Sequence, residues 1–147
     1  MEKLDILEAN FALMDTDFAF EFYNSNEAAI NALKREKYYI VVLSSVKVSE
    51  IIRACKDKRT LSKAIKLMAN DDIIHIKEDI SELSVELLKK YSLSHNLDIA
   101  DAIIAATALY YDFHLATCNV SDFKFIPKLK LVKHKVVPQR CGGWLFR

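Results

Sequence analysis

Short apolar runs alternate along this chain with longer stretches in which apolar residues recur every three or four positions. Short continuous runs are typical of buried strands, whereas the three-to-four spacing is typical of helices with one buried face. On this basis we expect strands at residues 11–14, 39–43, 73–76, 115–117 and 129–137. We expect helices around residues 18–22, 30–33, 48–55, 61–68, 80–91 and 98–111.

This alternation of strands with helices favours an α/β fold with a mainly parallel sheet, because each helix returns the chain to the start of the next strand. Two glycines and two prolines are too few for the many tight turns of an all-β protein. The length of 147 residues fits one domain. The hydrophobic fraction of 52% is enough to build a sizeable core.

Charge is distributed unevenly, although the net charge is only +1. After Asp122 the chain has seven basic residues and no acidic one, so the preceding part is acidic. Such a division suits a protein that holds cations at one place and contacts phosphates at another. A solubilising terminal strand explains it equally well.

Cysteine and apolar patterns exclude several other classes. Cys55, Cys118 and Cys141 are widely spaced and include no C-x-x-C pair, which predicts reduced thiols in a cytoplasmic protein and no zinc framework. No apolar run reaches about 18 residues, so we expect no membrane span.

Four acidic residues are predicted near one edge of the sheet. Asp15 follows the first strand, Glu50 lies in the helix after the second, and Asp122 follows strand 115–117. Asp101 falls in the first turn of a helix, where the helix dipole favours negative charge. Because sites in open parallel sheets form outside the carboxyl ends of the strands, these side chains are candidates for one site.

Each acidic residue also has a simpler explanation. Asp15 and Asp122 could cap the turns that follow them. Glu50 could form a surface pair with Arg53, and Asp101 could complete a capping box begun by the aspartate three positions earlier. Taken one at a time, these interpretations are the better ones, but they do not explain why all four residues fall at one edge.

A cluster of carboxylates would repel itself unless a cation intervened. Ligand sets of oxygen alone, with no histidine or cysteine, match hard ions, so the sequence predicts Mg²⁺ or Mn²⁺ and not zinc. Such ions activate water and stabilise charge on a phosphodiester. The chemistry that fits is therefore hydrolysis without a covalent intermediate.

Four segments resemble the signature motifs of the PIN domain family. They are residues 13–18 (LMDTDF), 48–52 (VSEII), 101–108 (DAIIAATA) and 117–123 (TCNVSDF). Each motif alone is weak, whereas the last two are specific as a pair. Within the family the chain is most similar to VapC-like toxins of toxin–antitoxin pairs.

The resemblance, which covers roughly residues 11–135, implies a PIN-like three-layer α/β/α sandwich. Residues 11–137 would form the PIN domain, with an extension at 1–10 and a tail at 138–147 to which we assign no function. The implied activity is metal-dependent endoribonuclease cleavage of RNA by the toxin of a toxin–antitoxin pair. The implied partners are RNA, an antitoxin protein and a second copy of the chain in a homodimer.

The resemblance also assigns roles to individual residues. Asp15 and Asp101 would be the principal metal ligands. The catalytic and metal-binding set would be Asp15, Glu50, Asp101 and Asp122, supported by Thr16, Thr117 and Asn119. Two positions depart from the family pattern: Cys118 stands where a basic residue is common, and Asp17 replaces a frequent asparagine.

Two alternatives stay open at this point. Asp15 and Asp17 also match the D-x-D motif of haloacid-dehalogenase-like phosphatases, in which the first aspartate is the nucleophile. Asp71 and Asp72 are poor candidates for the paired acidic motif that this class needs, since they precede a strand. A non-catalytic PIN-like scaffold is the other alternative, which the retention of all four acidic residues disfavours.

Overall fold

The computed structural model describes residues 10–35 and 40–138, and every structural statement below refers to that part of the chain. Its five strands form one sheet in the order β3-β2-β1-β4-β5, with every neighbouring pair parallel. The strands are β1 (Phe11–Met14), β2 (Ile40–Ser44), β3 (Asp72–Ile74), β4 (His114–Ala116) and β5 (Lys130–Leu131). The predicted α/β fold with a parallel sheet is confirmed.

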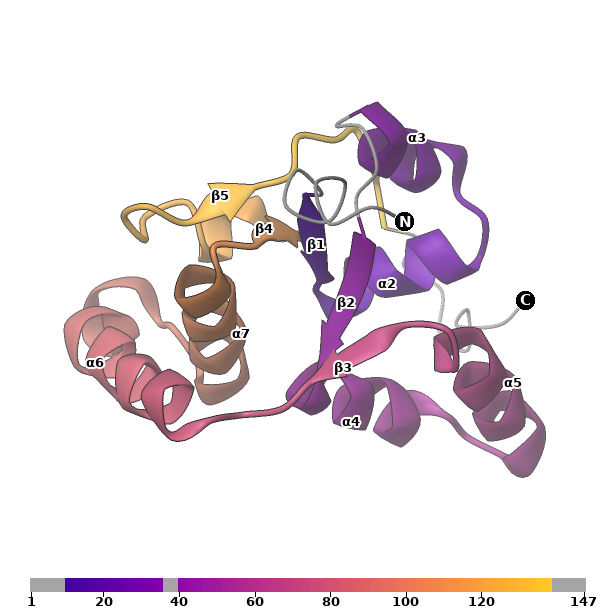
Figure 1. Ribbon diagram of the computed structural model, residues 1–147, viewed down its shortest axis with the longest axis horizontal. Helices are drawn as coiled ribbons and strands as arrows, with labels where there is room; N and C mark the ends of the chain where they lie inside the picture. The colour runs from indigo at the N-terminus through magenta and orange to yellow at the C-terminus, as the bar shows by residue number, and fades with distance from the viewer. Residues whose placement is uncertain (1–9, 36–39, 139–147) are drawn as a thin grey trace, which may run out of the picture.

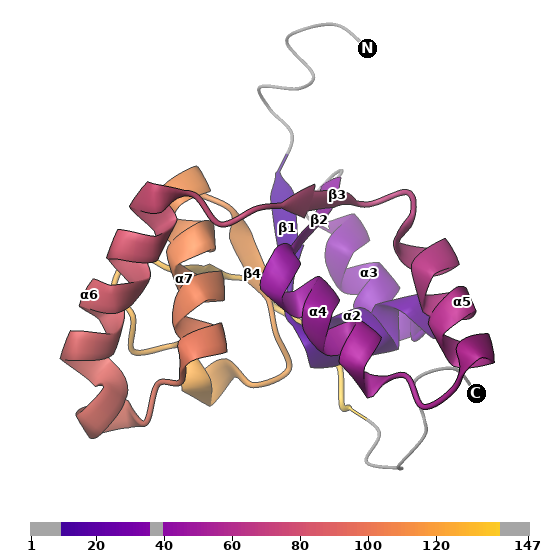
Figure 2. The ribbon, with the colours of Figure 1, turned by 90° about the horizontal axis from the view of Figure 1, so that it is seen from below.

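Helices cover both faces of this sheet (Figures 1 and 2). They are α2 (Thr16–Tyr23), α3 (Glu27–Arg35), α4 (Ser45–Ala54), α5 (Lys58–Met68), α6 (Glu78–His95) and α7 (Ile99–Tyr111), followed by the short 3₁₀ helix η1 (Val120–Asp122). Helices α2 to α5 lie on one side, and the antiparallel pair α6 and α7 lies on the other (Figure 2). The result is the expected three-layer α/β/α sandwich.

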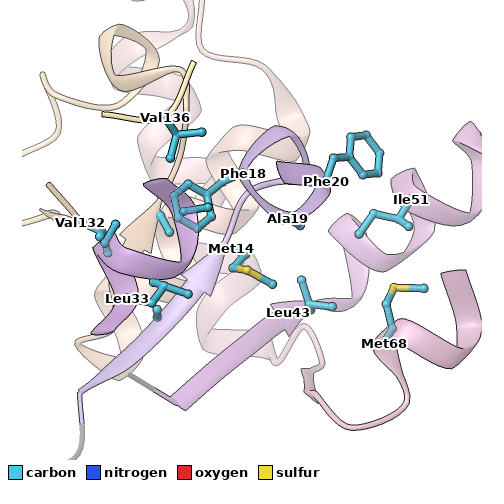
Figure 3. Close-up of a cluster of buried hydrophobic side chains, with 14 of the residues drawn as sticks. Met14, Phe18, Ala19, Phe20, Leu33, Leu43, Ile51, Met68, Val132 and Val136 are labelled. Atoms are coloured by element: carbon cyan, nitrogen blue, oxygen red, sulfur yellow. The ribbon is translucent and has the colours of Figure 1, made fainter. Parts of the chain in front are cut away.

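Alternating side chains of the central strand β1 serve two separate cores. Ala12 and Met14 pack with the helices α2 to α5, whereas Leu13 packs with α6 and α7. This follows from the period of two along a strand, which sends neighbouring side chains to opposite faces. Figure 3 shows Met14 in the first core, with Phe18 of α2 and Leu43 of β2 nearby.

The order of the strands places a change of direction beside β1. The chain adds β2 and β3 on one side of β1, and β4 and β5 on the other. Binding sites in open α/β sheets form at such switch points, outside the carboxyl ends of the strands. In this chain that place lies after Met14 of β1 and Ala116 of β4.

The last predicted strand, at residues 129–137, is wrong in extent, since β5 contains only Lys130 and Leu131. The final bond to β4 runs from the amide of Val132 to the carbonyl of Leu115. Because β4 ends one residue later, the ladder has no further partner. Val132 and Val136 instead bury their side chains in the α2–α5 core beside Phe18 (Figure 3).

The remaining elements match the predictions with small shifts at their ends. The strand predicted at residues 73–76 is β3, which begins one residue earlier and ends two residues earlier. Residue 39 of the strand predicted at 39–43 lies outside the described residues. The predicted extension at 1–10 and tail at 138–147 also lie almost entirely outside them. None of the helices in the described part of the chain is long and apolar enough to cross a membrane.

Candidate metal centre

Asp15 lies at the switch point and is held there on three sides. It directly follows β1, and its amide donates to the carbonyl of Ala116 in β4 at 2.9 Å. Its Oδ1 caps α2 by accepting from the amide of Thr16 at 2.8 Å, and its Oδ2 accepts from the hydroxyl of Thr117 at 2.8 Å. Asp15 is therefore a helix cap, as the simpler explanation proposed, but its buried carboxylate has further partners.

Three carboxylates from different elements meet at the ammonium group of Lys47, on the first turn of α4. The Nζ atom lies 3.1 Å from Oδ1 of Asp15, 3.1 Å from Oε2 of Glu50 and 3.3 Å from Oδ1 of Asp101. Lys47 is only 3% exposed. We call these four residues the Lys47 cluster. It brings together three of the four predicted acidic site residues.

Glu50 reaches the cluster from the next turn of α4. The hydroxyl of Thr16 donates to its Oε2, which also accepts from Lys47 three positions earlier. The surface pair with Arg53 considered from the sequence is not among the contacts described for Glu50, and Arg53 is exposed. Glu50 therefore faces the carboxylates at the sheet edge.

Asp101 joins the cluster from α7, which packs beside α4. Asp98 is the N-cap of α7, and its side chain accepts from the amide of Asp101 at 2.8 Å. The carboxylate of Asp101 does not complete a capping box but points to Lys47. Asp98 therefore caps the helix, but the side chain of Asp101 takes no part in the cap and is available to the site.

Burial and charge set the protonation of this cluster. Burial raises the pKa of Asp101 to about 6, with Lys47 opposing the shift and the charges of Asp15 and Asp98 adding to it. Burial alone would lower the pKa of Lys47, but the three surrounding carboxylates outweigh it and raise that pKa. Lys47 is therefore a permanent positive charge at physiological pH.

A second layer of hydrogen bonds fixes the loop after β4. The hydroxyl of Thr117 donates to Asp15 while it accepts from the amide of Asn119 at 3.0 Å. The side-chain amide of Asn119 donates to Asp17 at 3.1 Å, across the switch point. The backbone carbonyl of Asn119 accepts from the amide of Asp122 at 3.0 Å, which starts η1. Thr117 and Asn119 thus link Asp15 to the loop that carries Asp122, and the supporting roles expected of Thr16, Thr117 and Asn119 stay predictions.

Asp122 is the one predicted acidic residue that the structure does not bring into the cluster. It lies in η1 with its side chain exposed, and no hydrogen bond or ion pair described for its carboxylate links it to the other three. Its role in the site stays a prediction.

The donor set of the Lys47 cluster fits a hard cation. All donors are carboxylate oxygens, with the Thr16 and Thr117 hydroxyls beside them. Burial and the charges of Asp17, Glu21 and Asp15 raise the pKa of the nearby Cys118 thiol to about 12, so in the metal-free protein this thiol is protonated at neutral pH.

Among the described residues, no group of three or more acidic, histidine or cysteine side chains is already spaced to hold a metal ion. The ammonium of Lys47 lies among the three carboxylates and contacts one oxygen of Asp15, one of Asp101 and both of Glu50, as a small cation would.

Two residues of the site escaped the sequence analysis. The sequence does not predict a site role for Lys47, because a lysine is rarely buried. Its spacing of three from Glu50 on one helix does indicate that the two side chains can form an ion pair. His134 contacts the carbonyl of Thr117 through Nε2 and accepts from the amide of Val136 through Nδ1. It holds the segment after β5 against the site, and its isolated position in the sequence gave no sign of this.

Comparisons with known proteins agree with this geometry. A model of the PIN domain family matches residues 12–128. Ribonuclease VapC19 from Mycobacterium tuberculosis is 39% identical over 56 residues, which are 37% of this chain and 45% of that relative. The chain therefore matches less than half the length of this curated relative.

Solved structures extend the similarity to most of the chain. A toxin–antitoxin complex from Klebsiella pneumoniae contains a chain with 28% identity and a TM-score of 0.68, covering 83% of this chain and 98% of that one. DNA-bound VapBC from Salmonella typhimurium has a TM-score of 0.70 at 17% identity, covering 83% of this chain and 96% of that one, and shows the shared fold. From its motifs, its sheet topology and the match over residues 12–128, the chain belongs to the PIN domain family.

Proposed function

We propose that this protein is a divalent-metal-dependent endoribonuclease and the toxin of a toxin–antitoxin pair. The observation that carries the proposal is the convergence of Asp15, Glu50 and Asp101, from three different elements, on one cation position at the switch point of the sheet. PIN family membership and the similarity to a VapC ribonuclease support the same activity.

Asp15, Glu50 and Asp101 would hold Mg²⁺ or Mn²⁺, and Asp122 would approach from η1 as a fourth acidic group. When bound, the ion would supply positive charge for the attacking water and for the phosphodiester oxygens. Thr117 and Thr16 orient Asp15 and Glu50 through hydrogen bonds, which fixes the direction of the carboxylate oxygens. Asp15, at 5% exposure, is the most buried of these three acids, whereas Glu50 and Asp101 border the solvent.

Exposed lysines provide a surface for the RNA backbone. All five described lysines after Asp122 are exposed, and of these Lys130 is paired with Asp112 at 2.9 Å. Lys133 and Lys135 flank His134, which contacts the carbonyl of Thr117 beside the site. These two lysines suit a phosphodiester substrate, because lysines bind phosphates chiefly through charge.

An antitoxin and a second copy of the chain are the partners we propose. The antitoxin is supported by the similar chain from Klebsiella pneumoniae, which was solved in a toxin–antitoxin complex. The second copy is proposed from the resemblance to VapC-like toxins alone. Light scattering of the purified chain would test the homodimer, and co-purification with the product of a neighbouring short gene would test the antitoxin. A monomer at all concentrations would contradict the first, and no association with such a product would contradict the second.

The activity is tested by incubating antitoxin-free protein with labelled RNA in Mg²⁺, in Mn²⁺ and in a chelator. We expect cleavage with either ion, none with the chelator, and none for Asp101→Asn. The exposed substitution Lys89→Met serves as the matched control and should cut normally. Equal cleavage in the chelator, or by Asp101→Asn, would refute the proposal, and so would intact RNA in all arms.

The two alternatives are separated from this proposal by two other measurements. A phosphatase would use an oxygen of Asp15 as nucleophile, but Oδ1 already accepts from Thr16 and Lys47, and Oδ2 from Thr117. A trapped aspartyl-phosphate would nevertheless favour it. A non-catalytic scaffold would show no metal binding in calorimetry at millimolar ion concentrations.

A further inference from the structure

Lys47 is a charged side chain in an unusual position. Both its ammonium and its aliphatic stem are buried, with the side chain only 4% exposed. Its ammonium lies 3.1 to 3.3 Å from one oxygen of each of Asp15, Glu50 and Asp101, and 3.4 Å from the second oxygen of Glu50. Carboxylate oxygens therefore supply the acceptors for the ammonium.

The same three oxygens are the ones that a divalent ion would need. Mg²⁺ binds carboxylate oxygens at about 2.1 Å and demands a full shell of oxygens. An ion bound to these atoms would lie close to the ammonium in a buried site, where like charges repel strongly. The ammonium and the ion therefore compete for one position.

We propose that Lys47 is a tethered cation that occupies the metal position of the metal-free protein and must leave when the ion binds. The inference rests on the proposed function, since it presumes that the Lys47 cluster is the metal centre. It gives Lys47 two roles. The residue holds three acids together without metal, and it sets how tightly the protein binds its ion.

The Lys47 ammonium has a path from the cluster to solvent. The cluster opens to solvent on the side of Glu50 and Asp101, whose side chains are 38% and 20% exposed, whereas Asp15 closes the inner side. The four-carbon stem of Lys47 is long enough to carry its ammonium past these two carboxylates into water. The population of this open form limits the apparent affinity for the ion, since only open molecules bind.

A merely structural lysine would behave differently. If Lys47 only stabilised the fold, its removal would weaken the metal-free protein and leave ion affinity unchanged or lower. If it competes with the ion, its removal must raise ion affinity. The two roles are therefore separated by measuring binding and not only stability.

Amine footprinting of the wild-type protein tests the displacement directly. An N-hydroxysuccinimide acetate reagent acylates exposed lysines, and mass spectrometry gives the rate at each position. We expect Lys47 to react slowly in a chelator and roughly tenfold faster or more in saturating Mn²⁺. Lys89, which is exposed and pairs with Glu86, is the internal control and should react at one rate in both conditions.

Calorimetry with Mn²⁺ alone tests the affinity. Lys47→Met keeps the length of the side chain without its charge, and we expect it to bind Mn²⁺ roughly tenfold more tightly or better. Lys89→Met is the matched control and should bind as the wild type does. The wild-type footprint keeps the test valid even where Lys47→Met fails to fold.

The outcomes separate the two proposals. Mn²⁺ binding to the wild type with Lys47 still protected would overturn the inference and leave the metal centre standing. Unchanged or weaker Mn²⁺ binding by folded Lys47→Met would also overturn it. No Mn²⁺ binding by the wild type and no change in its footprint would overturn the inference together with the proposed metal dependence.

Discussion

The hydroxyl of Thr117 donates to Oδ2 of Asp15 at 2.8 Å, across two neighbouring parallel strands and 102 positions along the chain. Both residues directly follow a strand, and each is at most 5% exposed. The bond fixes one oxygen of Asp15 and leaves the other directed at Lys47. Thr117 therefore determines which way the central acid of the site faces.

Replacing Thr117 with valine should loosen this orientation while it preserves the shape of the side chain. We expect metal affinity to fall by roughly 10- to 100-fold, which is the usual effect of losing a hydrogen bond to a metal ligand. Calorimetry with Mn²⁺ measures the change. Thr107→Val is the matched control, because Thr107 is equally buried but donates to a carbonyl within α7. Equal binding by both variants would show that Thr117 does not orient Asp15.

Asp15→Asn and Asp101→Asn should both abolish cleavage but differ in metal-free stability. Asp15 accepts hydrogen bonds from Thr16 and Thr117 and contacts Lys47 in a buried setting. Its replacement leaves buried partners unsatisfied and should cost about 2–4 kcal/mol in free energy of unfolding. Asp101 contacts only Lys47 through its side chain and borders the solvent, so its replacement should change stability by less than about 1 kcal/mol.

Urea denaturation in a chelator measures both free energies of unfolding. A circular dichroism spectrum of each variant confirms that it starts folded. Equal losses for the two variants would mean that Asp101 is as deeply integrated in the fold as Asp15, contrary to the described contacts.

The raised pKa of Asp101 predicts that the metal-free protein loses stability as pH rises. Burial holds this pKa at about 6, above the ordinary value of 3.8, so the folded state binds the proton more tightly than the unfolded chain. The resulting stabilisation is complete below about pH 4 and is lost as pH rises through about 6.

The measurement is the free energy of unfolding of metal-free protein, by urea, between about pH 4 and pH 7. Because other groups titrate in the same range, the informative quantity is the difference between wild type and Asp101→Asn. We expect the wild type to lose more stability over this range than the variant. Parallel pH profiles would contradict the raised pKa of Asp101.

The sheet and most of its helices were predictable because their signals are local. The buried run before Asp15 and the apolar spacing of the helices depend on residues a few positions apart, and the PIN motifs added the order of the acids. The predicted extent of the last strand was wrong, although Val132 and Val136 are buried as they would be in a strand. Alternation of apolar and polar residues indicates which side chains are buried. Whether the segment pairs as a strand depends instead on the length of β4, which belongs to another part of the chain.

The sequence predicts that the site holds a positive charge, but it does not predict that a side chain supplies one. Convergent carboxylates require a positive charge, and the sequence predicts that a divalent ion supplies it. In the structure Lys47 of the chain itself supplies one. Nothing in the local pattern of α4 distinguishes a lysine that turns inward from one that faces water, because the choice depends on Asp15 and Asp101 from other elements.

The segment after β5 should bind RNA through Lys133 and Lys135. His134 between them is held at the carbonyl of Thr117, and Val136 is buried, so the two exposed lysines flank a point anchored to the site. Substituting both with glutamine should remove about two phosphate contacts. For single-stranded RNA each contact contributes about 0.7 to the slope of log affinity against log salt concentration.

We therefore expect a weaker RNA affinity at low salt and a salt slope smaller by roughly 1 to 1.4, measured by fluorescence anisotropy. The cleavage-deficient Asp101→Asn background keeps the RNA intact during the titration. Glutamines at Lys89 and Lys90 of α6 make the same change in net charge on a different element and should leave the slope nearly unaltered. If both double variants lower the slope equally, net charge and not the segment beside Thr117 governs RNA binding. An unaltered slope for Lys133 and Lys135 would place the RNA on another face of the molecule.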